Sequence, residues 1–229
     1  MSATAATIVP FGERGWLATL PGNDDPVATG LAANRIADAL RDADGIDSAV
    51  AGIDSIVIRF DFQRLNPETA RMLLETEINA TPVQAPAPAT ETITIPVCYG
   101  GQYGPDLADL AAHARLPEKA VVGVHASKPY RAATLGFAPG FAYLGMLDDQ
   151  LRAPRLSRPR AHVPAGSVGV AGGFTCVYPL PSPGGWRLIG QTPLRLFDPS
   201  SDDPLIIKPG AAVQFRPISE EAFLAEASS

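Results

Sequence analysis

Residues 81–90 read Thr-Pro-Val-Gln-Ala-Pro-Ala-Pro-Ala-Thr, and this stretch decides how the rest of the chain is divided. It has three prolines in ten residues and no hydrophobic period. That composition is typical of an extended, polyproline-like connector. We therefore predict two domains: one over residues 1–92, which ends in this linker, and one over residues 93–229.

The segment before the linker predicts an α+β domain. Residues 16–20 and 55–61 are strand-like, and residues 27–43 place apolar side chains on one face of a helix that Gly45 can end. Asn66, Pro67 and Glu68 then supply an N-cap, a proline at the first helical position and an acidic side chain at the positive end of the dipole. This second helix is expected to reach about residue 79. The expected order β-α-β-β-α suggests a ferredoxin-like sandwich.

The segment after the linker predicts a mostly-β domain. Residues 92–98 look like a strand that either completes the first sheet or starts the second, and two short amphipathic helices are expected at residues 105–115 and 117–125. Beyond Tyr130, short apolar segments alternate with glycine and proline turns, namely residues 175–180, 186–189, 194–197 and 212–215. This alternation is typical of a compact barrel or sandwich.

Charge and composition exclude several classes of protein. The net charge is -6, with 13 acidic and 6 basic residues over 1–92 and 11 and 12 over 93–229, which argues against a general nucleic-acid binder. There is no run of about 18 consecutive apolar residues, and the first four residues lack the basic start of a secretory signal. We expect a cytoplasmic protein that does not span a membrane. Its two cysteines, Cys98 and Cys176, are then expected to be unbridged.

Three familiar motifs are absent or incomplete. The glycine-rich run at residues 166–173 has neither the dinucleotide fingerprint nor a P-loop ending, so no ATP-binding motif is identifiable in this chain. The stretch around Ser167 resembles a nucleophile elbow, but strand-like residues follow where a helix is required, which favours a turn hydroxyl. None of the three histidines has metal-ligand spacing to another histidine or a cysteine, so we expect no metal site.

One region combines aromatic rings with cations. Phe141 and Tyr143 alternate, which places both rings on one side of an extended strand, either in the barrel core or as walls of a ligand pocket. His125 ends a predicted helix and either caps it or acts as an acid and base. Six cations lie between residues 128 and 160 against two acidic residues: Lys128, Arg131, Arg152, Arg155, Arg158 and Arg160. They form either a solvated face or a positive field suited to a carboxylate, a phosphate or an acidic partner.

Several ordered blocks closely resemble a known bacterial family. They are Tyr99-Gly100-Gly101-x-Tyr103-Gly104-x-Asp106-Leu107, His125-x-x-x-x-Tyr130, Gly136-Phe137-x-Pro139-Gly140-Phe141-x-Tyr143-Leu144, Pro154-Arg155, Pro159-Arg160, Val163-Pro164-Ala165-Gly166-Ser167-Val168-Gly169, and Ser182-Pro183-Gly184-Gly185-Trp186-x-Leu188-Ile189-Gly190-x-Thr192-Pro193. The family is that of the 5-oxoprolinase B subunits, also labelled sporulation kinase inhibitor and allophanate hydrolase subunit 1. The resemblance is strong over about residues 95–218 and only general over 1–92.

The resemblance implies a fold, partners and site residues. The fold would be an α+β N-terminal domain followed by a cyclophilin-like β-barrel. The function would be one component of an ATP-dependent complex, with subunits A and C, that opens 5-oxo-L-proline to L-glutamate, ATP being a co-substrate of the assembled complex. The alternatives are a regulatory inhibitor that binds a histidine kinase and a component of an allophanate or urea-derived amide hydrolase.

The chemistry of that substrate suggests a role for each residue of the region. Arg155 or Arg160 would bind the substrate carboxylate, Phe141 and Tyr143 would wall the ring, and His125 would move a proton. Two further positions are expected to contact substrate or partner: Ser167, and Gln191, which stands where arginine is common in the family.

Overall fold

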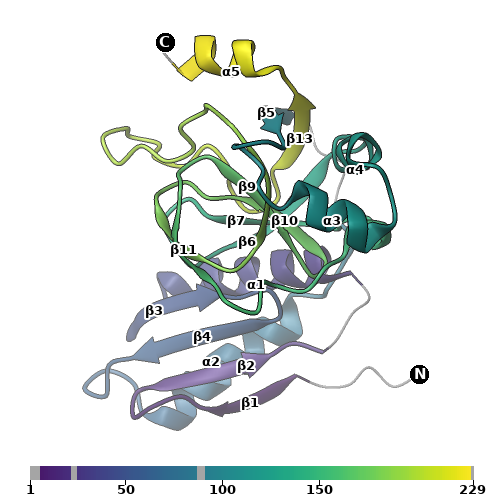
Figure 1. The fold of residues 1–229 in the computed structure, drawn as a ribbon. Coiled ribbons are helices and arrows are strands. Elements are labelled where there is room, and N and C mark those ends of the chain that lie inside the picture. The colour runs from purple at the N-terminus through teal and green to yellow at the C-terminus, as the bar shows by residue number, and fades with distance from the viewer. Residues whose placement is uncertain (1–5, 22–24, 87–90, 228–229) are drawn as a thin grey trace. The chain divides into compact units, whose positions relative to one another are not determined.

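The computed structural model describes residues 6–21, 25–86 and 91–227, and the chain divides into two compact units, residues 1–88 and 89–229. The predicted connector at residues 81–90 lies partly outside the described residues, because 87–90 are not among them, and the first five residues also lie outside. Figure 1 shows the order of the elements along the chain.

The N-terminal unit is an antiparallel sheet covered by two helices. Its elements are β1 (Thr7–Pro10), β2 (Gly15–Thr19), α1 (Pro26–Arg41), β3 (Ile46–Ala51), β4 (Ser55–Phe60) and α2 (Pro67–Ala80). The strands lie in the order β1-β2-β4-β3, and the two helices pack against each other and against the sheet (Figure 1). The core between them is built from small and branched side chains, among them Ala32, Ile36, Ile56 and Ile58, none of which is exposed.

Both helices of this unit begin at side-chain caps. The Asn66 side chain accepts a hydrogen bond from the backbone N–H of Thr69 at 2.9 Å, which confirms the N-cap predicted before Pro67. Asp25 does the same for α1, accepting from the N–H groups of Val27 and Ala28 at 2.9 and 3.1 Å. Each cap satisfies donors that the first helical turn cannot pair internally.

The order of elements differs from the expected β-α-β-β-α, and the ferredoxin-like arrangement is not confirmed. An additional strand, β1, precedes the others and forms a hairpin with β2 through a turn in which Gly12 has φ +68°. The strand beginning at Thr92 does not join this sheet. Its register with the last strands of the chain makes it part of the second unit.

The C-terminal unit is a closed seven-stranded barrel in the order β10-β7-β6-β13-β5-β12-β9. Its elements are β5 (Thr92–Tyr99), α3 (Leu107–Ala114), α4 (Glu118–His125), β6 (Tyr130–Leu135), β7 (Ala142–Gly145), the 3-10 turn Asp149–Leu151, β8 (Arg160–Val163), β9 (Ser167–Ala171), β10 (Phe174–Val177), β11 (Ser182–Gly184), β12 (Arg187–Gln191), β13 (Ala212–Pro217) and α5 (Glu220–Ala227). Closure leaves no unpaired strand edge in the barrel. The short strands β8 and β11 pair with each other outside it.

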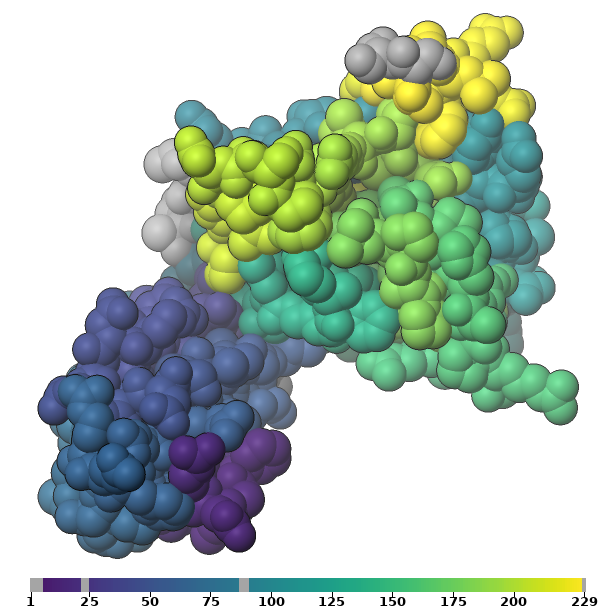
Figure 2. Space-filling view, turned by 90° about the vertical axis from the view of Figure 1, so that its left-hand side faces the viewer, coloured from purple at the N-terminus to yellow at the C-terminus, as the bar shows by residue number. Residues whose placement is uncertain are grey.

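Most of the predicted elements of this unit are present. The two short helices appear as α3 and α4, and the apolar segments at 175–180, 186–189 and 212–215 contribute β10, β12 and β13. The segment at 194–197 forms no strand, and only Phe197 makes an isolated bridge, to Leu205. Prolines at 193, 199, 204 and 209 interrupt the backbone donors that a ladder needs. Figure 2 shows this yellow-green connection at the surface of the C-terminal unit.

The structure also bears on the cysteines, on membrane-spanning helices and on clusters of metal-binding side chains. Cys98 and Cys176 are both free and buried, as the sequence predicts. Among the described residues, no helix is long and apolar enough to cross a membrane. In the same part of the chain, no cluster of three or more histidine, cysteine, aspartate or glutamate side chains is arranged to hold a metal ion.

Candidate functional site

A small aromatic cavity of about 130 Å³ opens on the barrel unit. It is lined by Phe137, Phe141, Tyr143, Arg155, Tyr178, Gly184, Gly185 and Trp186. Phe141 lies at the centre of the cluster, with ring centroids 5.2 Å from those of Tyr143 and Tyr178 and 5.7 Å from that of Trp186, all edge to face. A cavity below the roughly 300–1,000 Å³ of sites for drug-sized ligands suits a small metabolite.

The glycines of this region make room for the rings. At Gly184, a Cβ atom would collide with the Tyr178 hydroxyl, so only glycine lets that ring lie against β11. At Gly140, φ is +78° and a Cβ would meet Phe197 at 3.0 Å, so the turn that carries Phe141 into the cavity also requires glycine. These two glycines are therefore required by the packing of neighbouring rings.

Arg155 supplies positive charge to the cavity. Its side chain is exposed, and within the described parts of the chain it forms no ion pair with a carboxylate. Burial raises the pKa of Tyr143, while the nearby Arg155 guanidinium opposes that rise. Tyr143 therefore keeps its proton at neutral pH, and its hydroxyl makes no hydrogen bond with any described residue. The cavity thus offers a guanidinium fork and a phenolic donor to a ligand.

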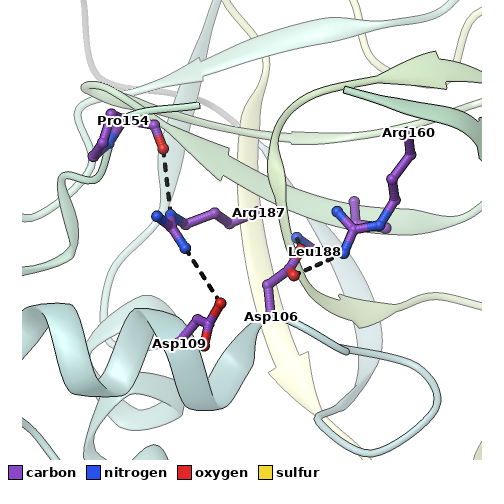
Figure 3. A network of polar contacts seen from close by, with 6 residues as sticks. All are labelled: Asp106, Asp109, Pro154, Arg160, Arg187 and Leu188. Atoms are coloured by element: carbon purple, nitrogen blue, oxygen red, sulfur yellow. Dashed lines mark hydrogen bonds and ion pairs between the residues drawn. The ribbon is translucent and has the colours of Figure 1, made fainter. Parts of the chain in front are cut away.

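Contacts at both ends hold the loop that carries Arg155 (Figure 3). At one end, Arg187 Nε donates to the carbonyl of Pro154 at 3.3 Å. At the other end, Arg160 Nη2 donates to Asp106 Oδ1 at 2.7 Å, and the second oxygen of this buried carboxylate accepts from the Leu188 N–H at 2.7 Å. Arg160 is therefore occupied with a structural ion pair, and it does not line the cavity.

The interior of the barrel holds His125, which is fully buried. Nδ1 of His125 lies 2.8 Å from the Tyr99 hydroxyl, and Nε2 lies 2.9 Å from Thr175 Oγ1. Thr175 donates its only hydroxyl proton to the Gly169 carbonyl, so it must accept from His125 Nε2–H. His125 is therefore neutral, with Nδ1 accepting from Tyr99. Burial lowers the pKa of His125 to about 3.

The predicted site residues therefore fall into three groups. Phe141, Tyr143 and Arg155 meet at the cavity, as the pocket hypothesis requires. The structure does not bring His125 or Arg160 to the cavity. Ser167 and Gln191 are opposite each other in the β9–β12 ladder, where Ser167 is buried and Gln191 donates to the Ala165 carbonyl at 2.8 Å. Neither of these two lines the cavity.

Three further aromatic residues of the cavity are not among the predicted site residues. Phe137 and Trp186 stand within the quoted blocks, beside glycines, and their position in those blocks is the signal that could have found them. Tyr178 has no such signal. It reaches the cavity only because β10 pairs with β7 and β9 in the closed barrel.

The barrel unit is a closed barrel whose small aromatic cavity has an arginine at its edge, and this lining has the chemistry to suit a small anionic molecule. The chain matches the family model described as carboxyltransferase domain, subdomain C and D, over residues 6–207, and it belongs to that family. This family includes the 5-oxoprolinase B subunits that the sequence blocks resemble, so the resemblance is confirmed.

Individual relatives support this placement. The chain is 45% identical over 188 residues to the 5-oxoprolinase B subunit of Escherichia coli O157:H7, covering 81% of this chain and 84% of that protein. A shorter match, 37% identical over 67 residues, is to the urea amidolyase of Lachancea kluyveri and covers 27% of this chain and 4% of that protein. The crystal structure of TTHA0988 is 33% identical with a TM-score of 0.75, and the match covers 90% of this chain but only 40% of that one.

Proposed function

We propose that this chain is one component of an ATP-dependent 5-oxoprolinase, and that the cavity holds 5-oxo-L-proline while the lactam is opened to L-glutamate. The observation that carries the proposal is the meeting of Phe141, Tyr143 and Arg155 in one small cavity. The Escherichia coli O157:H7 relative, 84% of which is matched by this chain, is named as the B subunit of 5-oxoprolinase, and this supports the proposal.

The cavity chemistry fits the parts of the substrate. 5-Oxo-L-proline is a small five-membered lactam that carries one carboxylate. Arg155 would bind the carboxylate with two parallel N–H donors, and the Tyr143 hydroxyl would donate to the lactam oxygen. The rings of Phe141 and Trp186 would contact the ring carbons, which excludes water from that face.

The remaining chemistry is assigned to the assembled complex. Transfer of the terminal phosphoryl group of ATP to the lactam oxygen would release ADP. Attack of a first water on that ring carbon would then break the C–N bond, with the nitrogen taking a proton, and give γ-glutamyl phosphate. A second water would hydrolyse this acyl phosphate to L-glutamate and phosphate. The sequence has no P-loop or dinucleotide fingerprint, so we place the nucleotide with the partner subunits A and C or at a shared interface. His125 is given no proton-transfer step, because both of its ring nitrogens are already hydrogen-bonded inside the barrel.

The proposal is tested by reconstitution. We predict that the chain alone releases little or no glutamate from 5-oxo-L-proline and ATP, and that the set with subunits A and C turns over. Robust turnover by the chain alone would contradict the proposed dependence on partners. If the set is inactive and a histidine kinase loses autophosphorylation when the chain is added, the regulatory alternative replaces it. Turnover of allophanate in place of 5-oxo-L-proline would support the amide hydrolase alternative, which the short urea amidolyase match favours.

A further inference from the structure

Phe137 stands at the mouth of the cavity in an unusual backbone conformation. Its φ is +68°, and the N–H of Ala138 donates to the carbonyl of Gly136 at 2.8 Å across it. Such a γ-turn with a positive central φ is rare and strained, and a bulky side chain there is a true outlier. The strain falls on a residue that lines the proposed binding site.

The side chain of Phe137 is also an apolar ring that is exposed to water. Its ring remains 60% exposed, although Phe141 and Tyr178 beside it are almost fully buried. The ring meets Phe141 edge to face at 5.2 Å and Tyr178 at 6.3 Å, so it continues the aromatic wall outward. Backbone strain and an exposed apolar ring at one position are most simply explained by a ligand that covers the ring, since strained residues concentrate at ligand clamps.

We infer that Phe137 is the residue that selects a cyclic ligand over an open-chain one. This inference rests on the proposed function, and it deepens that function by naming the residue that distinguishes a five-membered ring with one carboxylate from an open-chain acid. The face of the Phe137 ring, with its negative quadrupole, packs against the C–H groups of a bound ring.

The product of ring opening fits the same cavity poorly. L-Glutamate has two carboxylates, an ammonium group and no ring face, whereas Arg155 is the only cation among the residues that line the cavity. The second carboxylate would lie against aromatic faces without a partner, which is unfavourable. Phe137 therefore favours binding of the lactam and release of the opened product.

Trp186 provides a direct readout of ligand binding. The chain has two tryptophans, and the other, Trp16, lies in the N-terminal unit, so Trp16→Phe leaves a single reporter in the wall of the cavity. In this background, fluorescence titrations with 5-oxo-L-proline, cyclopentanecarboxylate and L-glutamate compare wild-type Phe137 with Phe137→Ala and Phe137→Gly. The glycine variant guards against misfolding, because it relieves the positive φ. Phe62→Ala, which removes another exposed ring, from the N-terminal unit, is the matched control.

We expect both Phe137 variants to bind the two cyclic acids about tenfold more weakly, with little change for L-glutamate and no effect of Phe62→Ala. Equal affinities in all variants, equal weakening for cyclic and open-chain acids, or no binding of cyclic acids to the wild-type cavity would overturn the inference. Weakened assembly with subunits A and C at unchanged ligand affinity would instead make Phe137 a partner contact. Failure of the proposed function is separate, because it appears as an inactive wild-type complex whatever the Phe137 variants bind.

Discussion

The barrel interior around His125 and the cavity around Arg155 lie in the same unit, yet the polar groups of the interior have hydrogen-bonding partners and those of Arg155 and Tyr143 have none in the part of the chain that the structure describes. Both ring nitrogens of His125 have a partner within 3 Å, and the ring is fully buried. Arg155 and the Tyr143 hydroxyl line an opening and have no hydrogen-bonding or ionic partner among the described residues. Fully satisfied polar groups stabilise a fold, whereas unsatisfied groups converging on a cavity are available to a ligand.

This difference also explains why two residues expected at one site lie apart. His125 and Arg155 are both cationic residue types, and both stand in blocks shared with the family. Burial keeps His125 neutral inside the barrel, and Tyr99 and Thr175 provide hydrogen-bonding partners for its two ring nitrogens. Arg155 lies in a loop held at both ends by Arg187 and Arg160, and its own guanidinium lines the cavity.

The largest expected effect concerns acid stability. Burial lowers the pKa of His125 to about 3 from 6.5, so between these pH values the unfolded chain binds a proton that the folded chain does not. The neutral His125 should therefore lower the free energy of unfolding by about 1.4 kcal/mol for each pH unit below 6.5, or by about 2 kcal/mol at pH 5. His125→Gln keeps an acceptor and a donor but does not titrate, so its loss of stability between pH 7 and pH 5 should be smaller by that amount.

Urea denaturation at pH 7 and pH 5 measures this difference. His162→Gln serves as the control, because it removes a histidine whose side chain is exposed. An identical pH dependence in wild type and His125→Gln would show that the interior histidine is not held neutral.

The second effect is on the cavity and should leave stability unchanged. Arg155→Lys keeps the charge but loses the planar fork, so the KM of the assembled complex for 5-oxo-L-proline should rise about tenfold. Arg158→Lys is the matched control, since Arg158 lies in the same exposed loop but does not line the cavity. If both variants behave like wild type, Arg155 belongs to a solvated surface and the contrast with His125 disappears.

The smallest effect tests the strain at Phe137. Phe137→Gly and Phe137→Ala both remove the ring, but only alanine keeps a Cβ at φ +68°. The glycine variant should therefore be more stable to urea by about 1 kcal/mol. At Phe62, where φ is not positive, the order should reverse because glycine is the more flexible residue in the unfolded chain. If the alanine variant is the more stable one at both positions, the backbone at the mouth of the cavity is not strained.

Local signals in the sequence predict most of the elements. The Asn66 cap, the two short helices and the strands beginning near Thr92 and Ala212 follow from capping chemistry and hydrophobic period, which act over a few residues. The sequence does not predict the additional strand β1, because its four residues are too few to show a hydrophobic period. The strand predicted at 194–197 is wrong because its apolar letters resemble a strand, although the flanking prolines prevent a ladder.

The residues of the candidate site also divide into those that local sequence signals predict and those that they do not. Without any structure, the residue pattern shows that aromatic rings, glycines and an arginine occur together near residues 136–160, and the ordered blocks point to the family. The folded chain is needed to see that Phe141, Tyr143 and Arg155 meet Tyr178 and Trp186 at one cavity, while His125 turns inward and Arg160 pairs with Asp106. The physical reason is that closure of the barrel joins strands distant in the chain, and whether a polar side chain finds a buried partner depends on those long-range pairings.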